Sequence, residues 1–444
     1  MEQQSCIRDF ARYTVFSVLG TLGVSCYILA DTFFVSKGLG TDGLTALNLA
    51  IPVYNFIHGT GLMLGMGGAT KFSVCKSQKK YKEVNQIYTN TLYLALLFSA
   101  AFVLTGLFFS GRLASLLGAN AEILPMTATY LRWLLLFAPA FILNDVLLCF
   151  VRNDNSPQLS MTAMLIGSFS NIILDYIFIF PMGMGIFGAV FATGLSPVIS
   201  VLMMLPHWLL KKNTFHLVKT KMKARIVQQD LSLGFPSLIA QLSSGIVMIV
   251  FNAIILNLQG NTGVAAYGVI ANISLVIVAL YTGIAQGVQP LISASYGAGN
   301  NRQARKVLRY AMLTMLVVSC MVYLLIFLFA QPITGIFNSQ HNGQLQQIAV
   351  TGLRLYFIAT AFVGYNIILA MYFTSVEKAL PAQILSVLRG FILIIPIAFL
   401  MSALWGMTGV WLTYPVTEAL VSLPGFIIDR HTKKQTERKE NYET

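Results

Sequence analysis

Long apolar stretches recur along the whole chain and are separated by short polar or basic segments. A helix that crosses a membrane needs about 20 mainly apolar residues. Windows of that length begin near residues 13, 47, 90, 131, 160, 186, 233, 264, 309, 349, 382 and 406. With 56% hydrophobic and only 10% charged residues, the chain carries more apolar surface than a soluble domain of 444 residues needs. We therefore expect an all-α membrane protein with twelve transmembrane helices.

Lysine and arginine residues cluster in alternate loops of this pattern. The basic stretches are 71–82, 211–225, 302–309 and 430–439. The opposite loops contain little beyond Lys37 and Arg112. This asymmetry predicts that both termini and the basic stretches lie in the cytoplasm, with the chain crossing the cytoplasmic (inner) membrane. Topology and contact with anionic lipid account for the net charge of +13. Membrane lipids are therefore expected partners, whereas no nucleic-acid-binding motif accompanies the basic loops.

The two halves of the chain repeat each other. At a shift of 220 residues, GLTALNLAIPVYNF (43–56) aligns with GVAAYGVIANISLV (263–276). At a shift of 222, LRWLLLFAPAFILN (131–144) aligns with LRLYFIATAFVGYN (353–366). An even number of spans in each half makes the repeats parallel, which predicts two pseudo-symmetric six-helix bundles.

The repeat also predicts how the chain divides into units. We expect an N-terminal six-helix lobe at 1–210, a basic cytoplasmic linker at 211–230, a C-terminal six-helix lobe at 231–430 and a charged cytoplasmic tail at 431–444. Parallel halves of this kind are common in secondary transporters, whose binding site lies near the interface of the repeats.

Four oxygen-bearing side chains of the first lobe are predicted to lie at similar depth. Asp175 and Thr193 lie nine residues before and after the centre of the turn PMGMG, so both lie about 13 Å from it. Asn171 is one helical turn from Asp175 and shares its helix face. Asp31 precedes Lys37, which marks the outer end of the first helix, by six residues, or about 9 Å.

The chemistry of these positions suggests an ion site. An ionised carboxylate inside a membrane costs about 2.5–3.5 kcal/mol, so Asp31 and Asp175 are expected to face a cavity or a partner. Two acids in one pocket can share a proton, and the same oxygens can coordinate Na⁺. Structural hydrogen bonds between helices are the alternative for each residue. Glu418 in the last helix is a possible secondary acid, and Asp145 is expected to be structural.

Common catalytic and cofactor motifs are absent from the sequence. We find no GxxxxGK[ST], HExxH or GxSxG, which would indicate nucleotide-driven transport or a hydrolase. The five Cys residues include no CxxC pair, so neither a disulfide framework nor a thiolate metal site is expected. We expect no cofactor other than a coupling ion, and no metal other than Na⁺ at the four residues above.

Three segments resemble the multidrug and toxic compound extrusion (MATE) family: LADTFFVSKGLG (29–40), NIILDYIFIF (171–180) and GIAQGVQPLISASYGAGNNRQARKV (283–307). The resemblance implies two six-helix lobes that rock between outward and inward states. Drugs, usually organic cations, leave as H⁺ or Na⁺ enters.

Within the family the chain looks like the DinF-like branch. That branch has an Asp in the first helix, Asn-xxx-Asp in the fifth and Thr in the sixth, which match Asp31, Asn171, Asp175 and Thr193. The NorM-like branch has a Glu early in the seventh helix, where this chain has no acid. The Pro that usually lies early in the first helix is replaced here by Phe16, which argues against a first helix that bends.

These observations favour a monomeric secondary antiporter, and not an enzyme, that exports organic cations in exchange for H⁺ or Na⁺ by alternating access. A lipid-linked oligosaccharide flippase is one alternative, but it predicts basic residues in the cavity, and Arg389 is the only cation near the middle of a predicted helix. An intramembrane enzyme with the two Asp as acid and base is another. It would need a nucleophile or a metal, and only His58 of the five His lies within a span. Substrate, coupling ion and stoichiometry stay open.

Overall fold

The computed structural model describes residues 2–338 and 342–443, with side chains described for residues 6–338 and 342–434. The described residues form helices joined by short turns, as the apolar pattern predicts. The helices are α1 (Glu2–Ser77), α2 (Tyr81–Leu116), α3 (Leu124–Leu136), α4 (Ala138–Asn153), α5 (Pro157–Ile179), α6 (Gly185–Met204), α7 (Pro206–Leu209), α8 (Ala224–Gly297), α9 (Asn301–Phe337), α10 (Gly343–Tyr356), α11 (Thr360–Ser375), α12 (Ala379–Val387) and α13 (Ile394–Glu443), with short η1 (Phe357–Ala359) and η2 (Leu388–Ile392) between them.

Three of the longest elements are helical hairpins that reverse at a glycine. α1 reverses at Gly40 (φ 68°), α8 at Gly260 (φ 60°) and α13 at Gly406 (φ 54°). Positive φ is readily adopted only by glycine, so these residues fix the hairpin turns. Gly40 and Gly260 are related by the repeat shift of 220, and Gly406 has its mate in Gly185, which also has positive φ.

The arms of these hairpins account for the predicted number of spans. Eight helical stretches are long and apolar enough to cross a membrane when α10 is joined to α11 (Gly343–Ser375) and α12 to α13 (Ala379–Lys434), and α3 with α4, bent by 46°, forms a ninth span. When the two arms of α1, α8 and α13 are counted separately, the described residues form twelve membrane-spanning segments. The prediction of an all-α membrane protein with twelve transmembrane helices is confirmed.

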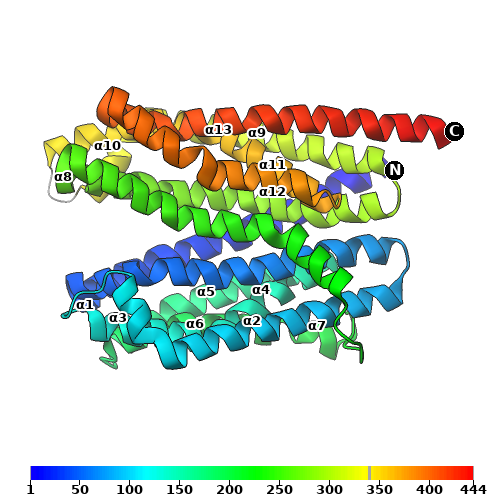
Figure 1. Cartoon of the computed structure of the whole chain (residues 1–444), viewed down its shortest axis with the longest axis horizontal. Coiled ribbons are helices and arrows are strands. Elements are labelled where there is room, and N and C mark those ends of the chain that lie inside the picture. The colour runs from blue at the N-terminus through cyan, green and yellow to red at the C-terminus, as the bar shows by residue number, and fades with distance from the viewer. Residues whose placement is uncertain (1, 339–341, 444) are drawn as a thin grey trace.

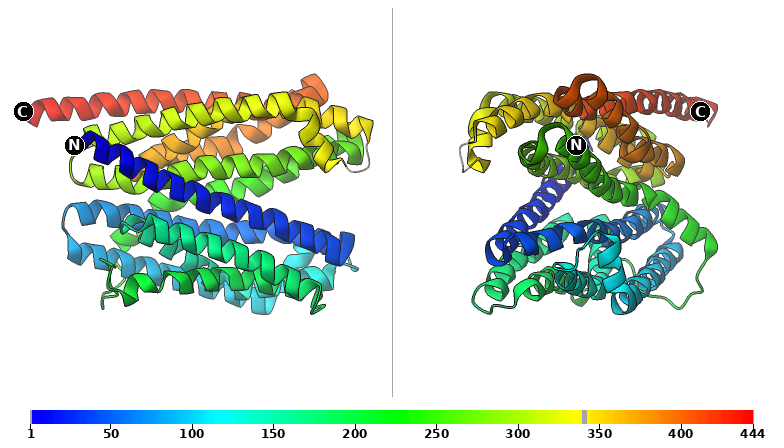
Figure 2. Two further views of the ribbon diagram at one scale, coloured as in Figure 1. Left: turned by 180° about the vertical axis from the view of Figure 1, so that it is seen from behind. Right: turned by 60° about the vertical axis from the view of Figure 1, so that its left-hand side comes forward.

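The segments form two bundles, as the repeat predicts. Elements α1 to α7 lie in the lower bundle of Figure 1, and α8 to α13 form the upper one. Each bundle has its own hydrophobic core, one running from Val35 to Phe215 and the other built mainly from Phe251 to Val421. The first arm of α1 links them: Cys6 belongs to the second core, and the arm then runs obliquely into the first bundle (Figure 2).

The basic loops, together with both termini, lie at one end of the molecule, which we call the basic end. It holds the connections after α1, after α7 and after α8, on the right in Figure 1. The helix that contains the seventh span begins earlier than its predicted window, because α8 starts at Ala224, within the predicted linker 211–230. α13 continues through the charged tail to Glu443. The first arm of α1, which contains Phe16, keeps helical dihedral angles up to Gly40 and is unbroken in this structure.

Polar contacts join the bundles near the basic end. Lys71 Nζ lies 2.7 Å from Glu377 Oε1, across the interface. Arg152 Nη1 donates to Gln286 Oε1 at 2.6 Å, and Asn153 Nδ2 donates to the side-chain oxygen of Gln289 at 2.8 Å. These contacts hold the two lobes together at that end.

Candidate functional site

Asp31, Asn171, Asp175 and Thr193 meet inside the first bundle, and we call these four residues the carboxylate site. Asp31 comes from the first arm of α1, Asn171 and Asp175 from α5, and Thr193 from α6. All four are buried, with 7% of Asp31 and none of Asp175 exposed. The two carboxyl groups lie within hydrogen-bonding reach of each other. The four residues, predicted from their spacing to lie at similar depth, are therefore also close together in space.

The Asn171 amide joins the second carboxylate to α6. With its nitrogen facing the acid, Asn171 donates to Asp175 Oδ2 at 3.0 Å, and its oxygen accepts from the backbone N–H of Thr193 at 3.3 Å. This orientation places each donor opposite an acceptor. The Thr193 hydroxyl donates to the Ala189 carbonyl oxygen at 3.0 Å. Asn171 and Thr193 thus fix the position of Asp175.

Two carboxylate oxygens of the site remain open. Oδ1 of Asp31 and Oδ1 of Asp175 have no hydrogen-bond donor among the described residues. A buried acceptor without a donor is costly, so such atoms favour a proton or a cation close by. The described residues contain no group of three or more His, Cys, Asp or Glu side chains that could hold a metal ion. Carboxylate, amide and hydroxyl oxygens are hard donors, which suit H⁺ or Na⁺.

Tyrosine side chains that sequence analysis did not single out surround the site. Tyr27 lies one helical turn from Asp31 on the same face, and its hydroxyl is hydrogen-bonded to that of Tyr54 in the second arm of α1. Tyr130 of α3 is buried, with 3% of the residue exposed, and lies close to Thr193 and both acids. The spacing of four residues between Tyr27 and Asp31 is the one signal in the sequence that could have placed a tyrosine beside the carboxylate site.

A second polar pair lies deeper in the same bundle. His58 Nδ1 lies 2.9 Å from Asp145 Oδ2, and the side chains are 17% and 6% exposed. The His58 ring centroid is 4.7 Å from that of Tyr54 and 5.4 Å from that of Phe141. Measured along α1 from the hairpin, His58 lies about 13 Å closer to the basic end than Asp31 does. Asp145, expected to be structural, therefore has an ionisable partner that sequence analysis did not assign to it.

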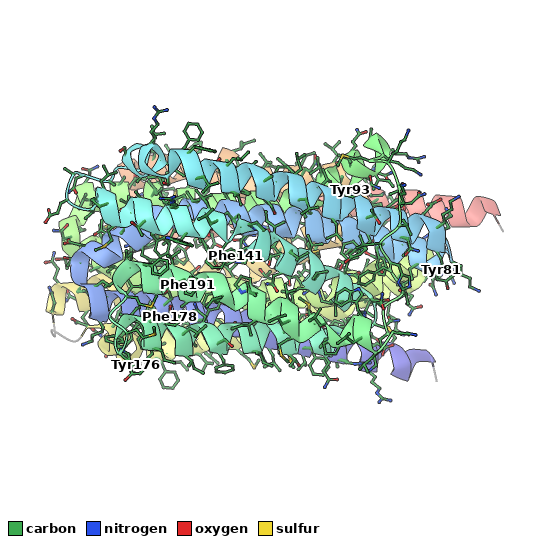
Figure 3. All side chains as sticks on the ribbon, turned by 90° about the horizontal axis from the view of Figure 1, so that it is seen from below. Tyr81, Tyr93, Phe141, Tyr176, Phe178 and Phe191 are labelled. Atoms are coloured by element: carbon green, nitrogen blue, oxygen red, sulfur yellow. The ribbon has the colours of Figure 1, made fainter. Side chains whose placement is uncertain are left out.

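Aromatic rings occupy the space between the carboxylate site and the hairpin of α5 and α6. The rings of Phe178 and Phe191 have centroids 5.7 Å apart and lie near each other between the ribbons, with Phe141 further along the bundle (Figure 3). Phe187 stacks on Phe191 at 5.4 Å. These side chains provide an apolar wall, with π faces that can contact a cation.

Glu418, the predicted secondary acid, is not part of the carboxylate site. It lies on α13 in the other bundle and is 1% exposed. Arg389 Nε donates to its Oε1 at 2.5 Å, and Asn366 Nδ2 donates to its Oε2 at 2.8 Å. The π-helical turn Leu388–Ile392 carries Arg389. The ion pair neutralises Glu418 within its own lobe.

A second buried cation lies near the end of a helix, where sequence analysis did not single it out. Arg152, near the end of α4, is 2% exposed and donates to Gln286 of the other bundle. Arg152 is the first residue of the charged stretch RNDN (152–155), which in the sequence looks like an exposed loop. The contact with α8 is what removes it from solvent.

Comparison with known proteins places this architecture in a family. The family model MatE matches residues 17–177 and 236–400. The multidrug export protein MepA of Staphylococcus saprophyticus is 25% identical over 96% of this chain and 94% of its own length, and MepA of Staphylococcus aureus strain MSSA476 shows the same figures. A solved structure described as the outward-facing conformation of a multidrug resistance MATE family transporter is 23% identical, with a TM-score of 0.91 over 97% of this chain and 96% of the other.

The two matched segments coincide with the two halves of the internal repeat and together cover well over half of the chain. The curated relatives and the solved structure extend the similarity over nearly its whole length. With the twelve spans in two bundles, these matches show that the chain belongs to the MatE family and is a multi-pass membrane protein.

Proposed function

We propose that the protein is a secondary active antiporter that exports small organic cations in exchange for H⁺ or Na⁺. The observation that carries the proposal is the pair of buried carboxyl groups, Asp31 and Asp175, within reach of each other. MepA is described as a multidrug export protein, which supports small organic compounds as the exported class. The match to the DinF-like residue pattern supports an ion site in this lobe.

Electrostatics explains how such a pair couples two fluxes. Two carboxylates side by side in a buried site repel each other when both are ionised, so the pair takes up a proton or a cation. A positively charged substrate that approaches the site competes with that ion for the same negative charge. Binding of one therefore favours release of the other, which is the requirement for exchange.

The polar contacts between lobes indicate which side the site serves in this state. They close the basic end, which by the positive-inside rule faces the cytoplasm. The carboxylate site lies toward the opposite end. We infer that the coupling ion enters from outside in this conformation, and that breaking the contacts at the basic end opens the route for substrate from the cytoplasm.

The surroundings of the charged groups weaken the rival functions. A flippase for a pyrophosphate-linked lipid would need cations that face the cavity, whereas the charge of Arg389 is neutralised by Glu418. An intramembrane enzyme would need a nucleophile beside the two acids. The hydroxyl groups that the structure places at the site are already hydrogen-bonded: that of Thr193 to the Ala189 carbonyl oxygen, and that of Tyr27 to the Tyr54 hydroxyl.

Reconstituted vesicles test the proposal. A pH gradient and a Na⁺ gradient are each imposed alone, and the wild type is expected to move a fluorescent organic cation under one of them. The gradient that drives transport identifies the coupling ion. Asp31→Asn and Asp175→Asn keep the side-chain shape but remove the charge, and each is expected to reduce transport to the level of empty vesicles. Asp42→Asn, an exposed acid beside the α1 hairpin, is the matched control. Full transport by both site variants at equal protein content would refute the proposal.

A further inference from the structure

A cavity of about 490 Å³ opens at the basic end of the first bundle, away from the carboxylate site. It lies between the beginning of α1, the beginning of α5 and the segment around α7. Its polar lining consists mainly of Arg12, Ser156, Gln158, Thr162, His207 and Lys212.

The cavity is positively charged. Arg12 and Lys212 contribute two cations, and the lining contains no Asp or Glu. The buried acid behind it, Asp154, is already neutralised: Lys76 Nζ lies 2.5 Å from its Oδ1, and His207 Nε2 lies 2.9 Å from its Oδ2. The charge of the cavity therefore attracts an anion.

Two further features provide hydrogen-bond donors for that anion. α5 begins here with Pro157 in its first turn, and the N-cap residue Ser156 makes no side-chain cap, so N–H groups of this turn are available. His207 lines the cavity and is only 1% exposed, and its Nδ1 has no partner among the described residues. Because Nε2 faces Asp154, Nδ1 donates to an anion when the ring is in its imidazolium form. Together with the two cations, these groups form a built site for an oxyanion.

The surroundings of the cavity are those of a membrane interface. Leu210 lines it and is 62% exposed, and the neighbouring Leu209 is 76% exposed. Trp208 lies between His207 and Leu209 in the chain and is partly buried. Tryptophan is enriched at the level of the lipid headgroups. A basic cavity bordered by exposed apolar side chains fits a molecule that has both a phosphate and an acyl chain.

We propose that this cavity binds the phosphate group of an anionic phospholipid of the inner leaflet. Basic pockets between transmembrane helices on the cytoplasmic side are known to suit such headgroups. A bound phosphate would connect Arg12 of α1 with the beginning of α5 and the linker, next to the contact of Tyr13 Oη with Asn155 Oδ1 at 3.4 Å. The lipid thus stabilises the basic end of the first lobe, where the beginning of α1 passes from the second bundle into the first.

The test measures lipid binding to the purified full-length protein by native mass spectrometry, with dioleoylphosphatidylglycerol, dioleoylphosphatidylcholine or inorganic phosphate added. Each basic residue near an anionic ligand contributes a factor of about five in affinity. The double variant Arg12→Gln/Lys212→Gln is therefore expected to bind phosphatidylglycerol about thirtyfold more weakly. Arg8→Gln/Lys221→Gln removes the same charge from exposed residues of the same end outside the cavity, and it should bind like the wild type.

A charge-keeping double variant, Arg12→Lys/Lys212→Arg, separates binding from damage to the fold and should retain most of the affinity. Equal loss of phosphatidylglycerol binding in the Arg8/Lys221 variant would show attraction by surface charge in general and would overturn the site. Equal competition by inorganic phosphate at the concentration of the lipid would overturn the assignment to a lipid. Binding of phosphatidylcholine as tight as that of phosphatidylglycerol would overturn the charge argument.

Discussion

Replacing Asp154 with Asn should destabilise the basic end of the first lobe. The Asp154 side chain is fully buried and accepts from four donors: Lys76 Nζ at 2.5 Å, His207 Nε2 at 2.9 Å, the Thr214 backbone N–H at 2.8 Å and the Thr214 hydroxyl. These contacts fasten the linker and α7 to the ends of α1 and α4. In Asp154→Asn one acceptor oxygen becomes an NH₂ group that faces donors in either orientation.

The size of the effect follows from burial. Breaking a buried ion pair by removing one partner costs about 3–5 kcal/mol. Lys76 is 19% exposed and can recover part of its hydration, so the lower limit of about 3 kcal/mol is the appropriate value. For a chain of 444 residues, with an unfolding entropy of about 2 cal/mol/K per residue, that corresponds to a fall in the unfolding temperature of roughly 3 °C.

The pH dependence has a defined sign. Burial by itself would raise the pKa of Asp154, but hydrogen bonds from His207, Lys76 and Thr214 outweigh burial and hold the pKa below its usual range. The ionised form is thus favoured in the folded state. Its contribution to stability is fully present above the unfolded pKa of about 4 and is lost as the pH falls through the lower folded pKa.

Thermal unfolding followed by tryptophan fluorescence is the assay, because the ring of Trp208 lies 5.6 Å from that of His207 and reports on this region. The unfolding temperature of Asp154→Asn should be lower than that of the wild type at pH 7, and the difference should shrink below about pH 4. Asp42→Asn, which is exposed, is the control. An unfolding temperature within 1 °C of the wild type at pH 7 would refute the reasoning.

Three further substitutions test other parts of the structure, each by thermal unfolding. Gly40→Ala places a side chain at φ 68° with nothing within 4 Å of the new Cβ, so it should cost about 1–3 kcal/mol through backbone strain alone; Gly111→Ala, in open space within helix α2, should cost nothing. Arg389→Gln leaves Glu418 charged and buried and should cost about 3 kcal/mol, and the double variant with Glu418→Gln should recover most of it; no recovery would mean that the charge pair is not the cause. His58→Ala should cost about 1–3 kcal/mol by leaving its carboxylate partner unpaired, and an unchanged unfolding temperature would contradict that pairing.

The sequence by itself determined the membrane architecture of this protein. A segment in lipid must satisfy all its backbone hydrogen bonds internally, so each apolar stretch has to be a helix, and the number of stretches fixes the number of spans. The repeat fixed the arrangement in two bundles, and regular helix geometry placed Asp175, Asn171 and Thr193 at matching depth around one hairpin. These features depend only on positions along a helix, and the chain lists those positions directly.

Tertiary structure decided which polar groups meet. Glu418 and Asp175 look alike in the sequence, as single acids within apolar runs, yet Arg389 of the preceding span neutralises Glu418 while Asp175 is placed beside Asp31. The pairing of His58 with Asp145 and the burial of Arg152 likewise depend on how helices are rotated and packed against each other. Rotation and packing are set by many weak contacts summed over whole helix faces, so no single residue or spacing encodes them.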